Sequence, residues 1–143
     1  MNWLTWSLLS ALFAGATAIL AKLGVKGVDS NLATAVRTAV VLVFAWGVVF
    51  ATGRAGSVAA FSRRTWIFLV FSGLATGFSW LCYFRALQLG EAAKVAPIDK
   101  LSVVFVLVFS ALFLGESLTA RTLLGGTLIA AGAIVLAWPT VAR

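Results

Sequence analysis

Five long apolar stretches, separated by short polar segments, make up almost the whole sequence. They cover residues 3–23, 32–52, 66–89, 95–114 and 123–138. A helix needs about 20 mainly apolar residues to cross the hydrocarbon core of a bilayer, and these stretches approach or exceed that length. We therefore predict an all-α membrane protein in which five transmembrane helices form a single membrane domain over residues 1–143.

The composition supports this prediction. The 143 residues are 62% hydrophobic and 10% charged, with a mean hydropathy of +1.09, whereas about a quarter of the residues in a soluble domain are charged. The net charge of +7 comes from basic residues at the ends of the apolar stretches, where they meet lipid headgroups. This distribution indicates membrane lipids as partners and no nucleic acid, and it leaves no room for a separate soluble domain.

The fourth stretch has a polar beginning, with Pro97, Asp99 and Lys100 close together. Such residues are costly in hydrocarbon and are usually kept for function or for anchoring. Pro97 either begins the helix or removes a hydrogen bond in its first turn, which makes it a candidate hinge. Lys100 is turned by about 100° from Asp99 on a regular helix, so we expect that the two do not form a local pair.

Two further basic residues lie within apolar stretches. Lys22 shares a helix face with Ala11, Gly15 and Ala18, and small residues favour close packing against a neighbouring helix. Arg37 lies about 9 Å inside the second stretch, at 1.5 Å per residue. Two interpretations fit both side chains: a role in gating or binding, and a simple extension toward the lipid headgroups.

The third stretch carries a candidate cavity face. Thr76, Trp80 and Tyr83 share one side of the helix with two glycines at GxxxG spacing. Small residues leave space and aromatic residues line it, as in many ligand cavities, although ordinary helix packing explains the same pattern. On the first stretch, Trp6 and Thr17 lie on the face opposite Lys22 and are added as candidate substrate-contacting residues.

No catalytic centre is indicated. The sequence has no His and a single cysteine, Cys82, within an apolar stretch. It also lacks a cluster of carboxylates and a phosphate-binding glycine loop, so nothing offers acid–base or metal chemistry. An enzyme is the least expected class, and we predict neither a metal nor any other cofactor.

Three segments carry a resemblance to a known family. They read YFRALQLGEAAKVAPI over residues 83–98, FLGESLT over residues 113–119 and LLGGTLIAAGAIVL over residues 123–136. In this order they resemble one half of an EamA-type transporter of the drug/metabolite transporter superfamily. Lys22 and Arg37 also occur where that family often has a Lys and an Arg.

The resemblance implies one inverted-repeat half of a ten-helix transporter, in a prokaryotic inner (plasma) membrane. Two departures stand out. The usual family member contains two such halves, and it often has a second proline where this sequence continues from Pro97 as IDKLSVV. Because the superfamily carries many kinds of solute, the resemblance does not identify the substrate.

The basic residues give almost no preferred orientation. Four basic residues lie in loops on the side of the N-terminus: Arg54, Arg63, Arg64 and Arg121. Three lie on the other side, Lys26, Lys94 and Arg143, and the number there rises to five if Lys22 and Arg85 also reach it. This near-zero bias is what a protein inserted in both orientations would show. Since the resemblance implies a relative with two inverted halves, we predict that two copies recreate this arrangement as an antiparallel homodimer. The alternative is a single orientation with Arg63 and Arg64 cytoplasmic, in which the chain forms a parallel dimer or pairs with another chain.

These elements suggest a transporter that works by alternating access. Lys22, Arg37, Asp99 and Lys100 lie within about 10 Å of the same membrane face, and Asp99 paired with Arg37 or Lys22 is a candidate gate. The excess of cations slightly favours an anionic or zwitterionic small molecule over a lipophilic cation. If a proton is coupled to transport, Asp99 is the only acid within a span that can carry it. The alternative function is a non-transporting membrane subunit or assembly partner.

Overall fold

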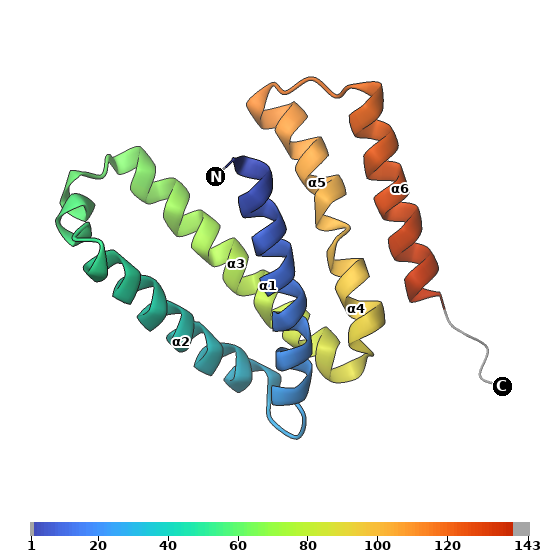
Figure 1. Cartoon of the computed structure of the whole chain (residues 1–143), viewed down its shortest axis with the longest axis horizontal. Coiled ribbons are helices and arrows are strands. Elements are labelled where there is room, and N and C mark those ends of the chain that lie inside the picture. The colour runs from blue at the N-terminus through green and yellow to red at the C-terminus, as the bar shows by residue number, and fades with distance from the viewer. Residues whose placement is uncertain (1, 139–143) are drawn as a thin grey trace. The chain divides into compact units, whose positions relative to one another are not determined.

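The computed structural model describes residues 2–138 as helices and turns, with no strand among them (Figure 1). The elements are α1 (Trp3–Gly24), α2 (Ser30–Ala51), η1 (Ala55–Ala60), α3 (Arg63–Leu89), α4 (Ala92–Asp99), α5 (Ser102–Phe109), η2 (Ser110–Leu114) and α6 (Ala120–Ala137). Five helical segments are long and apolar enough to cross a membrane, and α4, α5 and η2 together make the fourth. The predicted all-α membrane protein with five spans is confirmed. Pro139, expected to follow the last span, and Arg143 lie outside the described residues.

The chain divides into two compact units. The 20–88 unit comprises Leu20–Gln88, which includes the end of α1, all of α2 and η1, and nearly all of α3. The terminal unit comprises the earlier part of α1 and the chain from Leu89 onward. The predicted site residues are therefore distributed over both units, with Arg37 and Trp80 in the first and Asp99 in the second.

Four of the five spans begin two or three residues before the start of their apolar stretch, and in α2, α3 and α6 the reason is a polar first turn. The turn before α2 shows why. The Asp29 carboxylate accepts hydrogen bonds from the backbone N–H groups of Asn31 and Leu32, at 3.0 and 2.9 Å. An acidic N-cap satisfies otherwise unpaired donors and complements the helix dipole. Asp29 is thus the N-cap of α2.

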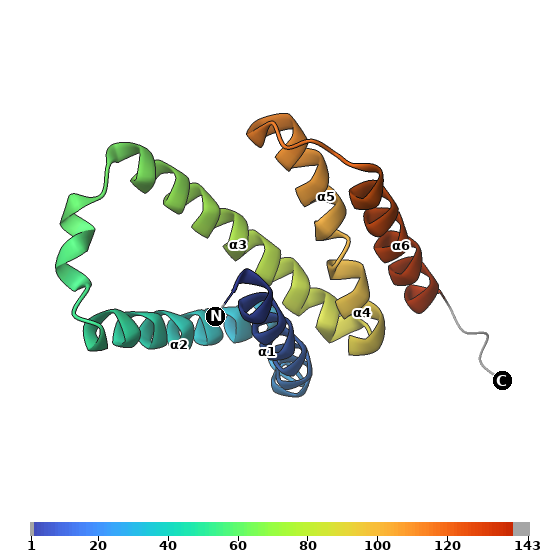
Figure 2. The same cartoon turned by 45° about the horizontal axis from the view of Figure 1, so that its top comes forward.

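The connection between α2 and α3 is more ordered than its composition suggests. It contains the short helix η1, visible in Figures 1 and 2, and it ends in a capped turn. The Ser62 hydroxyl accepts a hydrogen bond from the Thr65 N–H at 3.1 Å. The rings of Phe61 and Trp66 lie 6.0 Å apart on either side of this cap, as in a hydrophobic staple.

The fourth span is interrupted close to its polar beginning. Its helix starts at Ala92, so Pro97 does not begin the helix and lies in the second turn. After Asp99 the backbone tightens, and the Lys100 N–H donates to the Pro97 carbonyl three residues back, at 3.0 Å. The same three-residue spacing continues through Val104 N–H to Leu101 carbonyl, at 2.9 Å. Figure 1 shows the unwound turn between α4 and α5. Such 3₁₀ turns within a helix often mark a hinge.

Within the terminal unit, α4 and α5 both pack against α6. One close contact is at Gly126 of α6, which is buried. A β-carbon at this position would lie only 2.7 Å from Cδ1 of Leu107, so the leucine side chain would have to move to make room for it. After η2 the chain reverses through Gly115, whose φ of +69° is unfavourable for other residues. The small residues of the last span thus do serve helix packing, at least at Gly126.

Candidate binding site

In the 20–88 unit the ends of α1 and α3 are joined to each other and to the start of α2 by two short hydrogen bonds. The Lys22 ammonium donates to the Leu87 carbonyl at 2.6 Å, and the Gln88 side-chain amide donates to the Val28 carbonyl at 2.6 Å. Val25 and Leu87 are almost completely buried nearby. A cation close to the last carbonyls of a helix also complements the helix dipole. Lys22 therefore binds the end of α3 and does not merely extend toward lipid.

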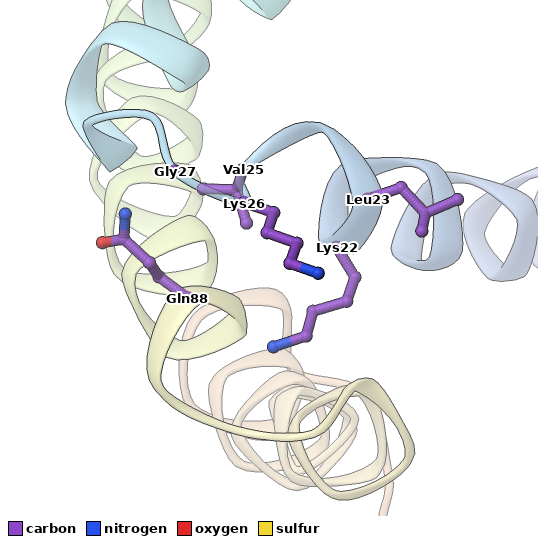
Figure 3. A pocket seen from close by; sticks show the side chains of 6 residues that line it. All are labelled: Lys22, Leu23, Val25, Lys26, Gly27 and Gln88. Carbon is purple, nitrogen blue, oxygen red and sulfur yellow. The ribbon is translucent and has the colours of Figure 1, made fainter.

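A pocket of about 480 Å³ opens beside this junction (Figure 3). Figure 3 shows the side chains of Lys22 and Lys26 reaching from the end of α1 toward the same space. The residues that line it are Lys22, Leu23, Val25, Lys26, Gly27 and Gln88. Two ammonium groups on one wall give the pocket a positive potential, which attracts anions.

The Arg37 guanidinium lies on an aromatic surface formed by α3. Its Cζ is 4.3 Å from the centre of the Trp80 ring and 5.3 Å from the centre of the Phe84 ring. Both distances are within the range of cation–π attraction. Arg37 and Trp80 are half-buried, and Phe84 is buried. The geometry thus joins a residue predicted for the gate to one predicted for the cavity.

The direction of the Arg37 side chain can be read from the two rings. Arg37 lies seven residues after Ser30, about 10 Å into α2, and Trp80 lies nine residues before Leu89, about 13 Å from the end of α3. Phe84 is one turn nearer that end. The guanidinium is closer to Trp80 than to Phe84, so it lies nearer the ring that is farther from the end of α3.

The other predicted cavity residues have varied environments. On α3, Thr76 is exposed and its hydroxyl donates to the Ser72 carbonyl at 2.9 Å, whereas Tyr83 is half-buried. In the terminal unit, Trp6 is exposed and Thr17 is half-buried on α1. Of the predicted site residues in the 20–88 unit, the structure brings together Arg37 and Trp80.

Phe84 was not predicted as a site residue. The signal was present in the sequence, because Phe84 follows Trp80 by four residues and so lies on the same helix face. Nothing in the sequence, by contrast, shows that Lys22 would reach the Leu87 carbonyl on another helix.

The expectation that Asp99 and Lys100 do not pair is wrong. The Lys100 ammonium lies 3.3 Å from the Asp99 carboxylate. The expected separation of about 100° assumes a continuous α-helix, but α4 ends at Asp99, and the long lysine side chain folds back across the turn. Both side chains are partly exposed, so the pair holds weakly and leaves Asp99 open to other partners.

The side chains that meet in the 20–88 unit are suited to binding a ligand. It offers charged donors, an amide and aromatic rings. Among residues 2–138 the structure gathers no group of three or more His, Cys, Asp or Glu side chains that could hold a metal ion.

Comparison with known proteins agrees with the resemblance seen in the sequence. Residues 1–138 match the EamA-like transporter family, and the chain belongs to that family. A relative from Sinorhizobium sp., described as an uncharacterized transporter in the cobO 3' region, is 54% identical over 136 residues. The match covers 95% of this chain and 96% of the relative, so the relative also has room for about five spans. No solved structure matches the chain.

Family and fold together define an integral membrane protein of a transporter family. The bacterial source of the relative fits an inner membrane, and the description of the relative points to a transporter rather than an enzyme. Small molecules and membrane lipids are the partners that such a family implies. The printed description of the relative gives no substrate.

The contact between Arg37 and Trp80 predicts a measurable coupling. Arg37→Met and Trp80→Leu, alone and combined, should give a coupling of about 0.5–2 kcal/mol in the free energy of unfolding in detergent, because the cation–π contact is partly shielded from water. Arg64 and Phe68 form a matched control pair, with Cζ 5.7 Å from the ring centre near the start of α3. Their coupling should be clearly smaller. Equal coupling in the two pairs would contradict the packing described for Arg37.

Proposed function

We propose that this protein moves a small metabolite or drug-like solute across the membrane by alternating access, as an antiparallel homodimer of single EamA domains. The observation that carries the proposal is the position of Arg37, a charged side chain held on Trp80 and Phe84 within a span of a transporter-family protein. Charged residues inside membrane spans usually belong to a substrate or ion path.

The dimer supplies the second half that a five-span chain lacks. Transporters with inverted repeats bind their substrate between two halves of opposite orientation, and the balanced distribution of basic residues allows both orientations in the membrane. On α3, a β-carbon at Gly73 or Gly77 would meet no atom of the 20–88 unit within 4 Å. This GxxxG surface is therefore left for a helix from outside the unit.

The proposed path uses the residues predicted from the sequence. Thr76, Trp80 and Tyr83, with Trp6 and Thr17 from α1, line the cavity. Asp99 closes one side by pairing with Arg37 or Lys22, with Lys100 as its resting partner. Pro97 and the 3₁₀ turn that follows it form the hinge. Support for the hinge comes from the three-residue hydrogen bonds at Lys100 and Leu101, which leave the span without regular α-helical pairing at this point.

The gate predicts that Asp99→Asn impairs transport. Uptake by proteoliposomes should fall about tenfold or more, the size expected when a coupling of about 1–3 kcal/mol between gate and transport is lost. The transported solute is first found by screening amino acids, organic acids and aromatic cations with the unaltered protein. Folding and dimerisation, followed by unfolding temperature and elution volume, should not change.

Glu91→Gln is the matched control for Asp99→Asn. Glu91 also pairs with a lysine, Lys94, at 3.2 Å, but it lies in the turn between α3 and α4, so its neutralisation should leave uptake unaffected. Normal uptake by Asp99→Asn would remove the gate from the proposal. Folded, dimeric protein that moves none of the screened solutes would instead favour a non-transporting membrane subunit.

The antiparallel arrangement predicts two populations in the membrane. Reporters fused to the C-terminus, one active only in the cytoplasm and one only outside it, should both give strong signals. Adding a positive charge to the connection between α2 and α3, as in Ser57→Arg, should bias insertion toward one orientation. A strong signal from a single side with the unaltered sequence is incompatible with the antiparallel homodimer.

A further inference from the structure

We infer that Arg37 is an oxyanion-binding residue and that the transported solute carries a carboxylate or phosphate group, which binds the edge of the guanidinium while Trp80 covers its face. The inference rests on the proposed function, because it names the class of solute for the same path. It depends on three features of the 20–88 unit: the position of the guanidinium on the rings, the charges of the unit and the occupied face of Trp80.

The contact with Trp80 leaves the hydrogen-bond donors of Arg37 available. A guanidinium is planar, and its five N–H groups point outward in that plane. Trp80 lies on one side of the guanidinium, with its ring centre 4.3 Å from Cζ, and one ring cannot occupy five donors that point in different directions. Among residues 2–138 no hydrogen bond or ion pair of the Arg37 guanidinium is found. Its edge can therefore bind a planar carboxylate, or two oxygens of a phosphate, in the bidentate manner.

No acid of the same unit can neutralise Arg37. Asp29 is the only Asp or Glu between residues 20 and 88, and its carboxylate already accepts two backbone hydrogen bonds as the cap of α2. Asp29 also precedes Arg37 by eight residues, about 12 Å along the helix. A charge inside a span needs a counter-charge or water. The counter-charge for Arg37 must therefore come from outside the unit, and a solute in the path can supply it while the proposed gate is open.

The occupied face of Trp80 disfavours a cationic solute. An aromatic cavity residue can attract a cation through either face of its ring, but one face of Trp80 already holds the Arg37 guanidinium. A second cation at this ring would be repelled by the charge of Arg37. At the same end of the unit, Lys22 and Lys26 line the pocket of Figure 3 and add to the positive potential that draws an anion in.

The test measures binding of small probes that differ in one group. The purified protein is placed in nanodiscs of phosphatidylcholine, so that no anionic lipid competes for Arg37. Benzoate and phenyl phosphate are compared with the neutral benzamide and with the phenyltrimethylammonium cation. Binding is followed by quenching of tryptophan emission and by the shift of the unfolding temperature.

Benzoate, phenyl phosphate or both should bind at least about tenfold more tightly than benzamide and phenyltrimethylammonium, since charge-assisted bidentate hydrogen bonds are about twice as strong as neutral ones. The stronger of the two anions tells whether the site prefers a carboxylate or a phosphate. Arg37→Lys keeps the charge but loses the planar fork, and it should weaken binding of the preferred anion about tenfold. Arg64→Lys is the control, because the Arg64 Cζ also lies over an aromatic ring, 5.7 Å from the centre of Phe68 near the start of α3, and it should leave binding unchanged.

Equal binding of benzoate, phenyl phosphate and benzamide, or failure of both anions to bind, would overturn the inference. So would anion binding by Arg37→Lys that equals that of the unaltered protein. If Arg37→Lys does not fold, the ratio of anion to benzamide affinity in the unaltered protein decides alone. The result is separable from the proposed function: anion binding without uptake by proteoliposomes refutes transport only, whereas uptake with anion binding that is indifferent to Arg37 refutes this inference only.

Discussion

The electrostatic cost of a guanidinium inside a membrane span is the constraint on which the account depends. Arg37 cannot reach an acid of its own unit, because Asp29 is the only one and caps α2. The rings of Trp80 and Phe84 hold the guanidinium in place, but a cation–π contact does not neutralise it. A protein that keeps such a group within the bilayer needs water or an anion beside it, and a solute path provides both.

The backbone of the fourth span lacks some regular α-helical hydrogen bonds, which is also costly in hydrocarbon. Pro97 lacks the N–H that would bond the Ala93 carbonyl, and the turn after Asp99 replaces α-helical hydrogen bonds by three-residue ones. In hydrocarbon, irregular backbone is tolerated where protein or water surrounds it. The irregular turn and the charged pair of Asp99 and Lys100 occur at the same place in the span. This coincidence is why we assign both the hinge and the gate to this segment.

The sequence predicted the five spans because long apolar stretches are a strong signal, and the family resemblance followed from three short segments in a fixed order. The starts of the spans were placed too late, since hydropathy does not detect the polar first turns capped by Asp29, Ser62 and Thr119. The pairing of Lys100 with Asp99 was misjudged because helical periodicity gives no warning of where a helix is interrupted.

The candidate site was predictable in its residues but not in its contacts. Trp80 and Arg37 were both chosen from sequence, one as an aromatic on a small-residue face and the other as a lone charge in a span. That they stack on each other, and that Lys22 bonds the Leu87 carbonyl, depends on how three helix ends meet. Interhelical geometry of this kind leaves no local pattern in a single sequence.

The central claim, that Arg37 and Trp80 line a path open to water and selective for anions, can be tested by chemical labelling. Thr76 is one turn from Trp80, and Thr76→Cys in a Cys82→Ala background places a single thiol beside them. An anionic methanethiosulfonate reagent should modify this thiol faster than a cationic reagent of similar size, and Arg37→Gln should remove the preference. A thiol that reacts with neither reagent, or a preference that persists without Arg37, would contradict the account.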